Sequence, residues 1–155
     1  NEETLSIKFK NSKQMFQHGR NSLTAFNKDI LSSFFPRYIK VLKDYELQIS
    51  NIFVEGHTSS VYKFAKSKKE KFDFNMKLSF KRATKVVEFI KSLQDPIIIE
   101  NIDWINEVFK PLGKSSLDPI KNADGTENES LSRRVEFRVH TFAEEDASIE
   151  NDAAK

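Results

Sequence analysis

The side chains best suited to catalysis are few and scattered in this chain of 155 residues. The three histidines, His18, His57 and His140, lack the spacing of a zinc-binding motif. Ser59 and Ser60 do not lie in the G-x-S-x-G turn that exposes a nucleophilic serine. Cysteine is absent, which excludes a disulfide framework and a cysteine nucleophile. We therefore expect a binding protein rather than an enzyme, with no metal ion and no other cofactor.

A lysine-rich connection, residues 61–74, is a second candidate for chemistry, because it interleaves lysines with aromatic residues. Such a pattern is compatible with a stacking groove for nucleic acid or another polyanion. The simpler interpretation is a solvated loop, and no recognised nucleic-acid-binding motif accompanies it, so we do not expect nucleic acid as a partner. The residues concerned are Tyr62, Lys63, Phe64, Lys66, Lys68, Lys69, Lys71, Phe72 and Phe74.

Charge is distributed unevenly along the chain, although the formal net charge is only +2. Residues 141–155 carry five acidic side chains against Lys155, so this segment has a net charge of −4 and the remainder about +6. A basic body is compatible with nucleic acid, a membrane surface or an anionic wall polymer. We expect one domain over residues 1–140 and an acidic, mobile tail over 141–155.

No run approaches the roughly 20 apolar residues that a membrane helix needs. The chain begins at Asn1 without a basic segment or an apolar signal core. We therefore expect a portion of a longer protein, with any signal peptide or membrane anchor upstream.

Hydrophobic periodicity predicts strands at 5–9, 49–55 and 134–139, and helices at 22–44 and 75–93. Pro36 should kink the first helix or divide it in two. The first helix is expected to bury Phe26, Ile30, Phe34, Val41, Leu42 and Tyr45, and the second Leu78, Ala83, Val86, Val87, Ile90 and Leu93.

Between the second helix and the last strand the pattern is less decisive. Residues 97–99 form either a short strand or the lead into a short helix near 102–108, and Asp124-Gly125 marks a turn. The predicted order is β-α-β-α-(α/β)-β. This order is typical of an α/β (α+β) two-layer sandwich, with one mixed sheet and helices packed on it.

Three segments in this order resemble the OmpA/MotB carboxy-terminal family. The V-E-G-H-T of Val54–Thr58 ends the second strand, Asn75–Ala83 is similar to the family's N-x-x-L-S-x-x-R-A, and Arg133–Glu136 is similar to its N-R-R-V-E. A weaker likeness covers Gly113–Ile120, where the family tends to have G-x-x-x-x-P. The resemblance spans roughly residues 5–140.

This resemblance implies non-covalent binding of peptidoglycan. The domain would anchor a membrane protein or complex to the cell wall from the periplasm, tethered to the inner or outer membrane by a segment outside this chain. Likeness to MotB also suggests a homodimer. Polyanion or protein interaction through residues 61–74 stays open as the alternative function.

The resemblance also implies a site for diaminopimelate, which carries a carboxylate and an ammonium on one residue. In the family a helix arginine grips the carboxylate, and an aspartate after G-H-T faces the ammonium, with N–H groups at the helix start as further donors. Arg82 matches the arginine, and Asn75 matches the asparagine that opens the motif or simply caps the helix. The ligand-binding residues expected are Arg82, Asn75, Ser59, Thr58, Leu78, Asp73 and Arg133.

Ser59 departs from the family pattern, because the family has its aspartate at this position. A hydroxyl cannot neutralise a buried ammonium. Asp73 or Glu55 could supply the missing carboxylate, or the domain binds the wall weakly or binds something else. Of Arg133 and Arg134, we expect one to pair with an acid and the other to border the pocket.

Overall fold

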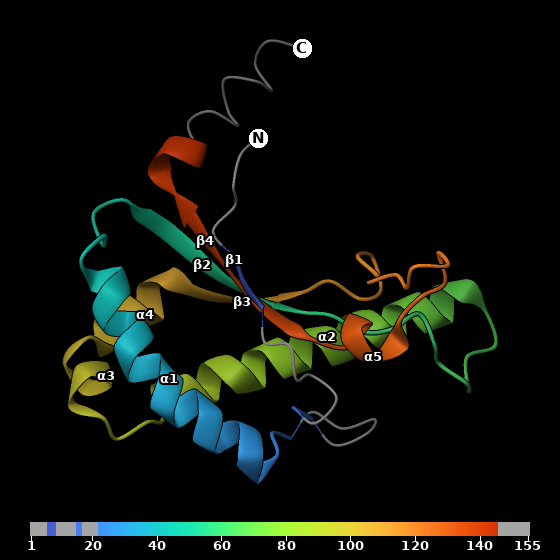
Figure 1. The fold of residues 1–155 in the computed structure, drawn as a ribbon, viewed down its shortest axis with the longest axis horizontal. Coiled ribbons are helices and arrows are strands. Elements are labelled where there is room, and N and C mark those ends of the chain that lie inside the picture. Colours follow the sequence, from blue (N-terminus) through green and yellow to red (C-terminus); the bar gives the residue numbers. More distant parts are fainter. Residues whose placement is uncertain (1–5, 9–14, 17–21, 146–155) are drawn as a thin grey trace.

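The computed structural model describes residues 6–8, 15–16 and 22–145, and it shows one mixed sheet with helices packed on it (Figure 1). The predicted two-layer α/β architecture is therefore confirmed. The elements are β1 (Ser6–Lys8), α1 (Ala25–Lys43), β2 (Ile49–Gly56), α2 (Lys68–Lys91), α3 (Pro96–Glu100), α4 (Ile102–Val108), β3 (Phe109–Gly113), α5 (Glu129–Ser132) and β4 (Val135–Thr141).

The strand order is β1-β4-β2-β3, so β4 lies inside the sheet and not at its edge. It pairs antiparallel with both β1 and β2, whereas β2 pairs in parallel with β3. The parallel pair requires a crossover, which α2, α3 and α4 supply. Strand β3 was not predicted, because its Pro111 and Gly113 carry no strand signal. Proline is tolerated there because β3 is an edge strand.

The core lies between the sheet and the two long helices. Val135, Phe137 and Val139 are buried on one face of β4, as their alternation predicts. Phe35 of α1 packs against Phe137, with 5.1 Å between the ring centroids. Each such buried aromatic or aliphatic side chain contributes roughly 1.5–3 kcal/mol.

The predicted core face of α1 was partly wrong: Leu42 is buried and Phe34 packs against the core, but other predicted residues are not. Phe26, Val41 and Tyr45 are each more than half exposed, because the buried stripe is rotated around the helix. Apolar residues occur on several faces of this helix, so periodicity alone did not identify the packed one. The buried apolar residues of α1 are Leu31, Phe35, Tyr38, Ile39 and Leu42.

Pro36 does not divide the first helix. It lies inside the single helix α1, between the buried side chains of Phe35 and Tyr38. Proline removes one helical hydrogen bond. Burial on both sides of Pro36 holds the two halves of α1 against the same core.

Helix α2 begins at Lys68, seven residues before the predicted start at Asn75. The Oγ of Ser67 accepts from the N–H of Glu70 at 3.1 Å, and the Glu70 carboxylate accepts from the N–H of Lys66 at 2.7 Å. This arrangement is close to a capping box, for which Ser67 and Glu70 have the required spacing. Asn75 is consequently not an N-cap, and half of the predicted loop over 61–74 is helical.

Residues 96–100 form a helix rather than a strand, which settles the ambiguous run. The side chain of Asp95 accepts from the N–H of Ile97 at 2.9 Å, and Pro96 occupies the first turn, where it is favoured. The predicted helix near 102–108 and the turn at Gly125, with φ of 83°, are confirmed.

The start of the predicted acidic tail packs against β2. The Glu145 carboxylate accepts from Ser50 Oγ at 2.7 Å and from Asn51 Nδ2 at 3.0 Å. Residues 146–155 lie outside the described part of the chain, so the division at residue 140 stays a prediction. Among the described helices, none is long and apolar enough to cross a bilayer.

Candidate functional site

The site is positioned by an unusually close approach of α2 to the ends of β2 and β3. A Cβ on Gly56 would lie 2.0 Å from the carbonyl oxygen of Ser79, and one on Gly113 would lie 3.0 Å from that of Met76. Only glycine permits this contact between strand and helix. It sets the middle of α2 beside the loop that leaves β2.

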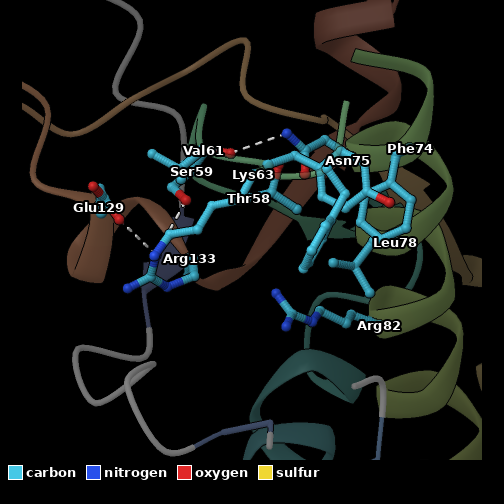
Figure 2. Close-up of a pocket in the computed structure, with 12 residues that line it drawn as sticks. Thr58, Ser59, Val61, Lys63, Phe74, Asn75, Leu78, Arg82, Glu129 and Arg133 are labelled. Atoms are coloured by element: carbon cyan, nitrogen blue, oxygen red, sulfur yellow. Dashed lines mark hydrogen bonds and ion pairs between the residues drawn. The ribbon is translucent and has the colours of Figure 1, made fainter. Parts of the chain in front are cut away.

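A cavity of about 560 Å³ opens between α2, this loop and the segment that leads into β4 (Figure 2). Its volume lies in the range typical of small-molecule sites. Six of the seven predicted ligand-binding residues line it, and Asp73 does not. The lining residues are Thr58, Ser59, Val61, Tyr62, Lys63, Phe64, Phe74, Asn75, Leu78, Arg82, Glu129 and Arg133.

Arg82 contributes a buried cation to this cavity. Its side chain is only 6% exposed, and its guanidinium lies 5.0 Å from the ring centroid of Phe16. Figure 2 shows the guanidinium projecting from α2 into the space between the helix and Arg133. Burial, reinforced by the charge of Arg133, lowers the pKa of Arg82 to about 10. A guanidinium in this setting is suited to an anionic ligand.

Arg82 lies in the middle of α2, so the N–H groups at the helix start, which the resemblance offers as further donors, do not lie beside it. The first turn of the helix, where free N–H groups could bind an anion, begins at Lys68. Those N–H groups are therefore not donors at the position of Arg82.

Arg133 lies on the opposite wall and bonds to the residue that departs from the family pattern. Its Nη1 donates to Ser59 Oγ at 3.1 Å and lies 3.3 Å from the Glu129 carboxylate (Figure 2). Glu129 was not among the predicted site residues. The one local indication was its four-residue spacing to Arg133, which is common in helical ion pairs. In the described part of the chain, the acid that lines this cavity is thus Glu129.

Asn75 ties the loop to the helix. Its side chain is 2% exposed, and its Nδ2 donates to the backbone oxygen of Ser59 at 3.1 Å. On the next turn, Ser79 Oγ accepts from the N–H of Ser115 at 3.0 Å, and the N–H of Thr58 donates to the oxygen of Ser115 at 2.8 Å. These bonds fix the position of Ser59 relative to α2.

The outer wall of the cavity is aromatic. Tyr62 and Phe74 stack with 3.8 Å between ring centroids, and Phe64 meets Tyr62 edge-on at 6.1 Å. Phe64 is 83% exposed. Because Tyr62 and Phe74 stack on each other, each has one ring face already covered.

Neither carboxylate proposed to replace the family aspartate lies at the cavity. Asp73 points from another face of α2 and pairs with Lys69 at 2.7 Å. Glu55 is buried outside the lining, 3.5 Å from His57, 3.6 Å from Arg138 and 3.9 Å from Lys114. Burial alone would raise the pKa of Glu55, but these three neighbours outweigh it and lower the pKa.

Arg134 and Glu136 form a buried ion pair, so the expectation that one arginine pairs with an acid while the other borders the pocket is confirmed. Glu55, His57 and Glu136 lie close enough together to hold a metal ion. Cationic side chains surround these two carboxylates, including Arg138 at 3.9 Å from Glu136. A further divalent cation would be repelled there. This cluster is better described as a buried ion-pair network centred on the paired residues Glu55 of β2 and Glu136 of β4.

The mixed sheet and the α2 crossover give this chain the fold of solved MotB periplasmic domains, which confirms, at the level of the fold, the resemblance inferred from the sequence. The chain is 35% identical to the Zorya protein ZorB of Escherichia coli over 142 aligned residues. These residues make up 92% of the chain. It spans only 60% of the length of that relative. No family model matches the chain.

Solved structures share the fold at lower sequence identity. The periplasmic domain of Helicobacter pylori MotB gives a TM-score of 0.59 at 19% identity, covering 94% of this chain and 88% of that one. The cell wall anchor of the T6SS from Pseudomonas aeruginosa gives 0.53 at 19% identity, covering 88% and 80%. Both likenesses concern the fold.

Proposed function

We propose that this chain is a non-enzymatic peptidoglycan-binding domain that anchors a membrane protein or complex to the cell wall from the periplasm. The names of the similar proteins support this proposal, since one is a periplasmic domain and another a cell wall anchor. The observation that carries it is the buried guanidinium of Arg82 in a cavity whose opposite wall presents Arg133.

The chemistry of the cavity suits the free end of a stem peptide. A guanidinium that has lost its water gains most from a carboxylate, which it meets through two parallel hydrogen bonds. Leu78 and the Tyr62–Phe74 stack offer apolar contact for the aliphatic chain of diaminopimelate. Asn75 and Thr58 would hold the loop against the bound ligand.

The test is sedimentation of the domain with purified sacculi at low salt. We expect the wild type to pellet and Arg82→Ala to stay in the supernatant. Arg37→Ala is the matched control, because Arg37 is an exposed arginine of α1 away from the cavity. Wild-type protein that stays in the supernatant would refute the proposal, and so would equal loss of binding in both variants.

The alternative, polyanion binding by residues 61–74, has weaker support. Tyr62 and Phe74 stack on each other, which leaves Phe64, beside Lys63, as the most exposed aromatic side chain of this segment. Binding to sacculi that falls steeply with salt and persists in Arg82→Ala would favour this alternative.

A further inference from the structure

The charge of the cavity lining indicates which form of the ligand it accepts, an inference that rests on the proposed function. Among the residues that the structure describes, three cationic side chains, Lys63, Arg82 and Arg133, line the cavity together with one acidic side chain, Glu129. The Glu129 carboxylate already lies 3.3 Å from Arg133. The lining is therefore net positive, and its acid is engaged by a cation of the protein.

The position beside Ser59 is also taken by a cation of the protein. Arg133 Nη1 donates to Ser59 Oγ at 3.1 Å, and Ser59 is only 3% exposed. A ligand ammonium placed there would face this guanidinium and would have a neutral hydroxyl as its acceptor. Two like charges at such range repel each other, whereas a carboxylate would be attracted by both arginines.

We infer that the cavity selects an anionic ligand end that carries no ammonium beside its carboxylate. In peptidoglycan this is diaminopimelate whose amine has been acylated, as a cross-link through that nitrogen makes it. An acylated amine is neutral, so the ligand end keeps a full negative charge for Arg82 and Arg133. The free zwitterionic end, with its ammonium, binds more weakly.

Binding of two small probes measures this preference directly. The domain is titrated with free meso-diaminopimelate and, separately, with its N-acetylated derivative. NMR at constant ionic strength then gives the ratio of the two affinities. We expect the N-acetylated form to bind about tenfold more tightly, as removal of one repulsive charge pair in a partly hydrated cavity implies. Equal binding, or tighter binding of the free form, would overturn the inference.

Two variants locate the cause of the preference. Arg133→Gln removes the cation at Ser59 and should bring the affinity ratio close to one. Adding Ser59→Asp to it supplies an acceptor for the ammonium and should reverse the ratio in favour of free diaminopimelate. The single variant keeps the test decisive if the double variant does not fold. A ratio unchanged in Arg133→Gln would contradict the inference.

Failure of this inference and failure of the proposed function give different results. If the wild type pellets with sacculi through Arg82 but prefers free diaminopimelate, wall binding stands and the selection for an acylated amine is wrong. If the wild type binds neither probe and does not pellet, both are wrong.

Discussion

Replacing Arg82 by methionine should stabilise the unliganded domain while abolishing its binding to the wall. Arg82 is 6% exposed, and burial together with the charge of Arg133 lowers the pKa of its guanidinium from 12.5 to about 10. At about 1.36 kcal/mol for each pKa unit, this lowering means that the folded state disfavours the charged form by about 3 kcal/mol. Methionine fills similar space without a charge.

Part of this gain is lost with the contacts that the guanidinium makes in the fold, among them the one to Phe16. A cation over an aromatic ring contributes about 0.5–2 kcal/mol, so the net stabilisation expected for Arg82→Met is at most about 1–2.5 kcal/mol. For a domain of this size, each 1 kcal/mol moves the melting temperature by about 2–4 °C. The net stabilisation is measured by urea or thermal unfolding of the wild type, of Arg82→Met and of the exposed control Arg37→Met.

The pH dependence of this effect has a definite sign. Because the folded-state pKa of Arg82 is lowered, arginine is protonated in both states at any pH well below about 10, and the cost of its charge is constant there. The cost is relieved only as pH rises above about 10. The advantage of Arg82→Met should therefore be equal at pH 6 and pH 8. A loss of stability greater than about 1 kcal/mol relative to Arg37→Met would refute this reasoning, because it would show that Arg82 serves the fold.

Three further substitutions test the scaffold of the site. Gly56→Ala places a Cβ 2.0 Å from the Ser79 oxygen, so it should lower the free energy of unfolding by about 1–3 kcal/mol or more, and an unchanged urea midpoint would contradict the close packing of α2. Asn75→Ala leaves the buried backbone oxygen of Ser59 without its donor at 3.1 Å. This should lower the free energy of unfolding by about 1–3 kcal/mol and weaken pelleting with sacculi. An unchanged free energy of unfolding would argue against that hydrogen bond. Glu55→Gln should destabilise the domain at pH 7. Because the folded-state pKa of Glu55 is lowered, its contribution exists above its ordinary value of 4.5 and disappears as pH falls through the lowered pKa, so the difference from wild type should shrink in acid.

The parts of the fold that could be predicted are those in which one periodicity dominates. The alternation over β4 identified its buried apolar residues, because one face of that strand lies in the core. The apolar residues of α1 occur on several of its faces, so the correct stripe depended on packing that the sequence does not display. Strand β3 contains Pro111 and Gly113, and only its parallel pairing with β2 makes it a strand.

The start of α2 decided how much of the site could be predicted. The resemblance supplied Arg82, Asn75 and Ser59, but the lysine-rich composition concealed the helix start at Lys68. With 3.6 residues per turn, Asp73 lies about 180° around the helix from Arg82, whereas Asn75 lies within about 20° of it. The chain from β3 to α5 brings Glu129 to the cavity from far along the sequence, which no local pattern indicates.

The most direct test of the central claim is NMR of the arginine side chains during titration with a purified muropeptide. If the cavity binds the wall, the Nε–Hε signals of Arg82 and Arg133 and the side-chain amide of Asn75 should shift together along a single binding curve, while Arg37 stays unmoved. Shifts confined to residues 63–71, with the Arg82 signal unchanged, would contradict it.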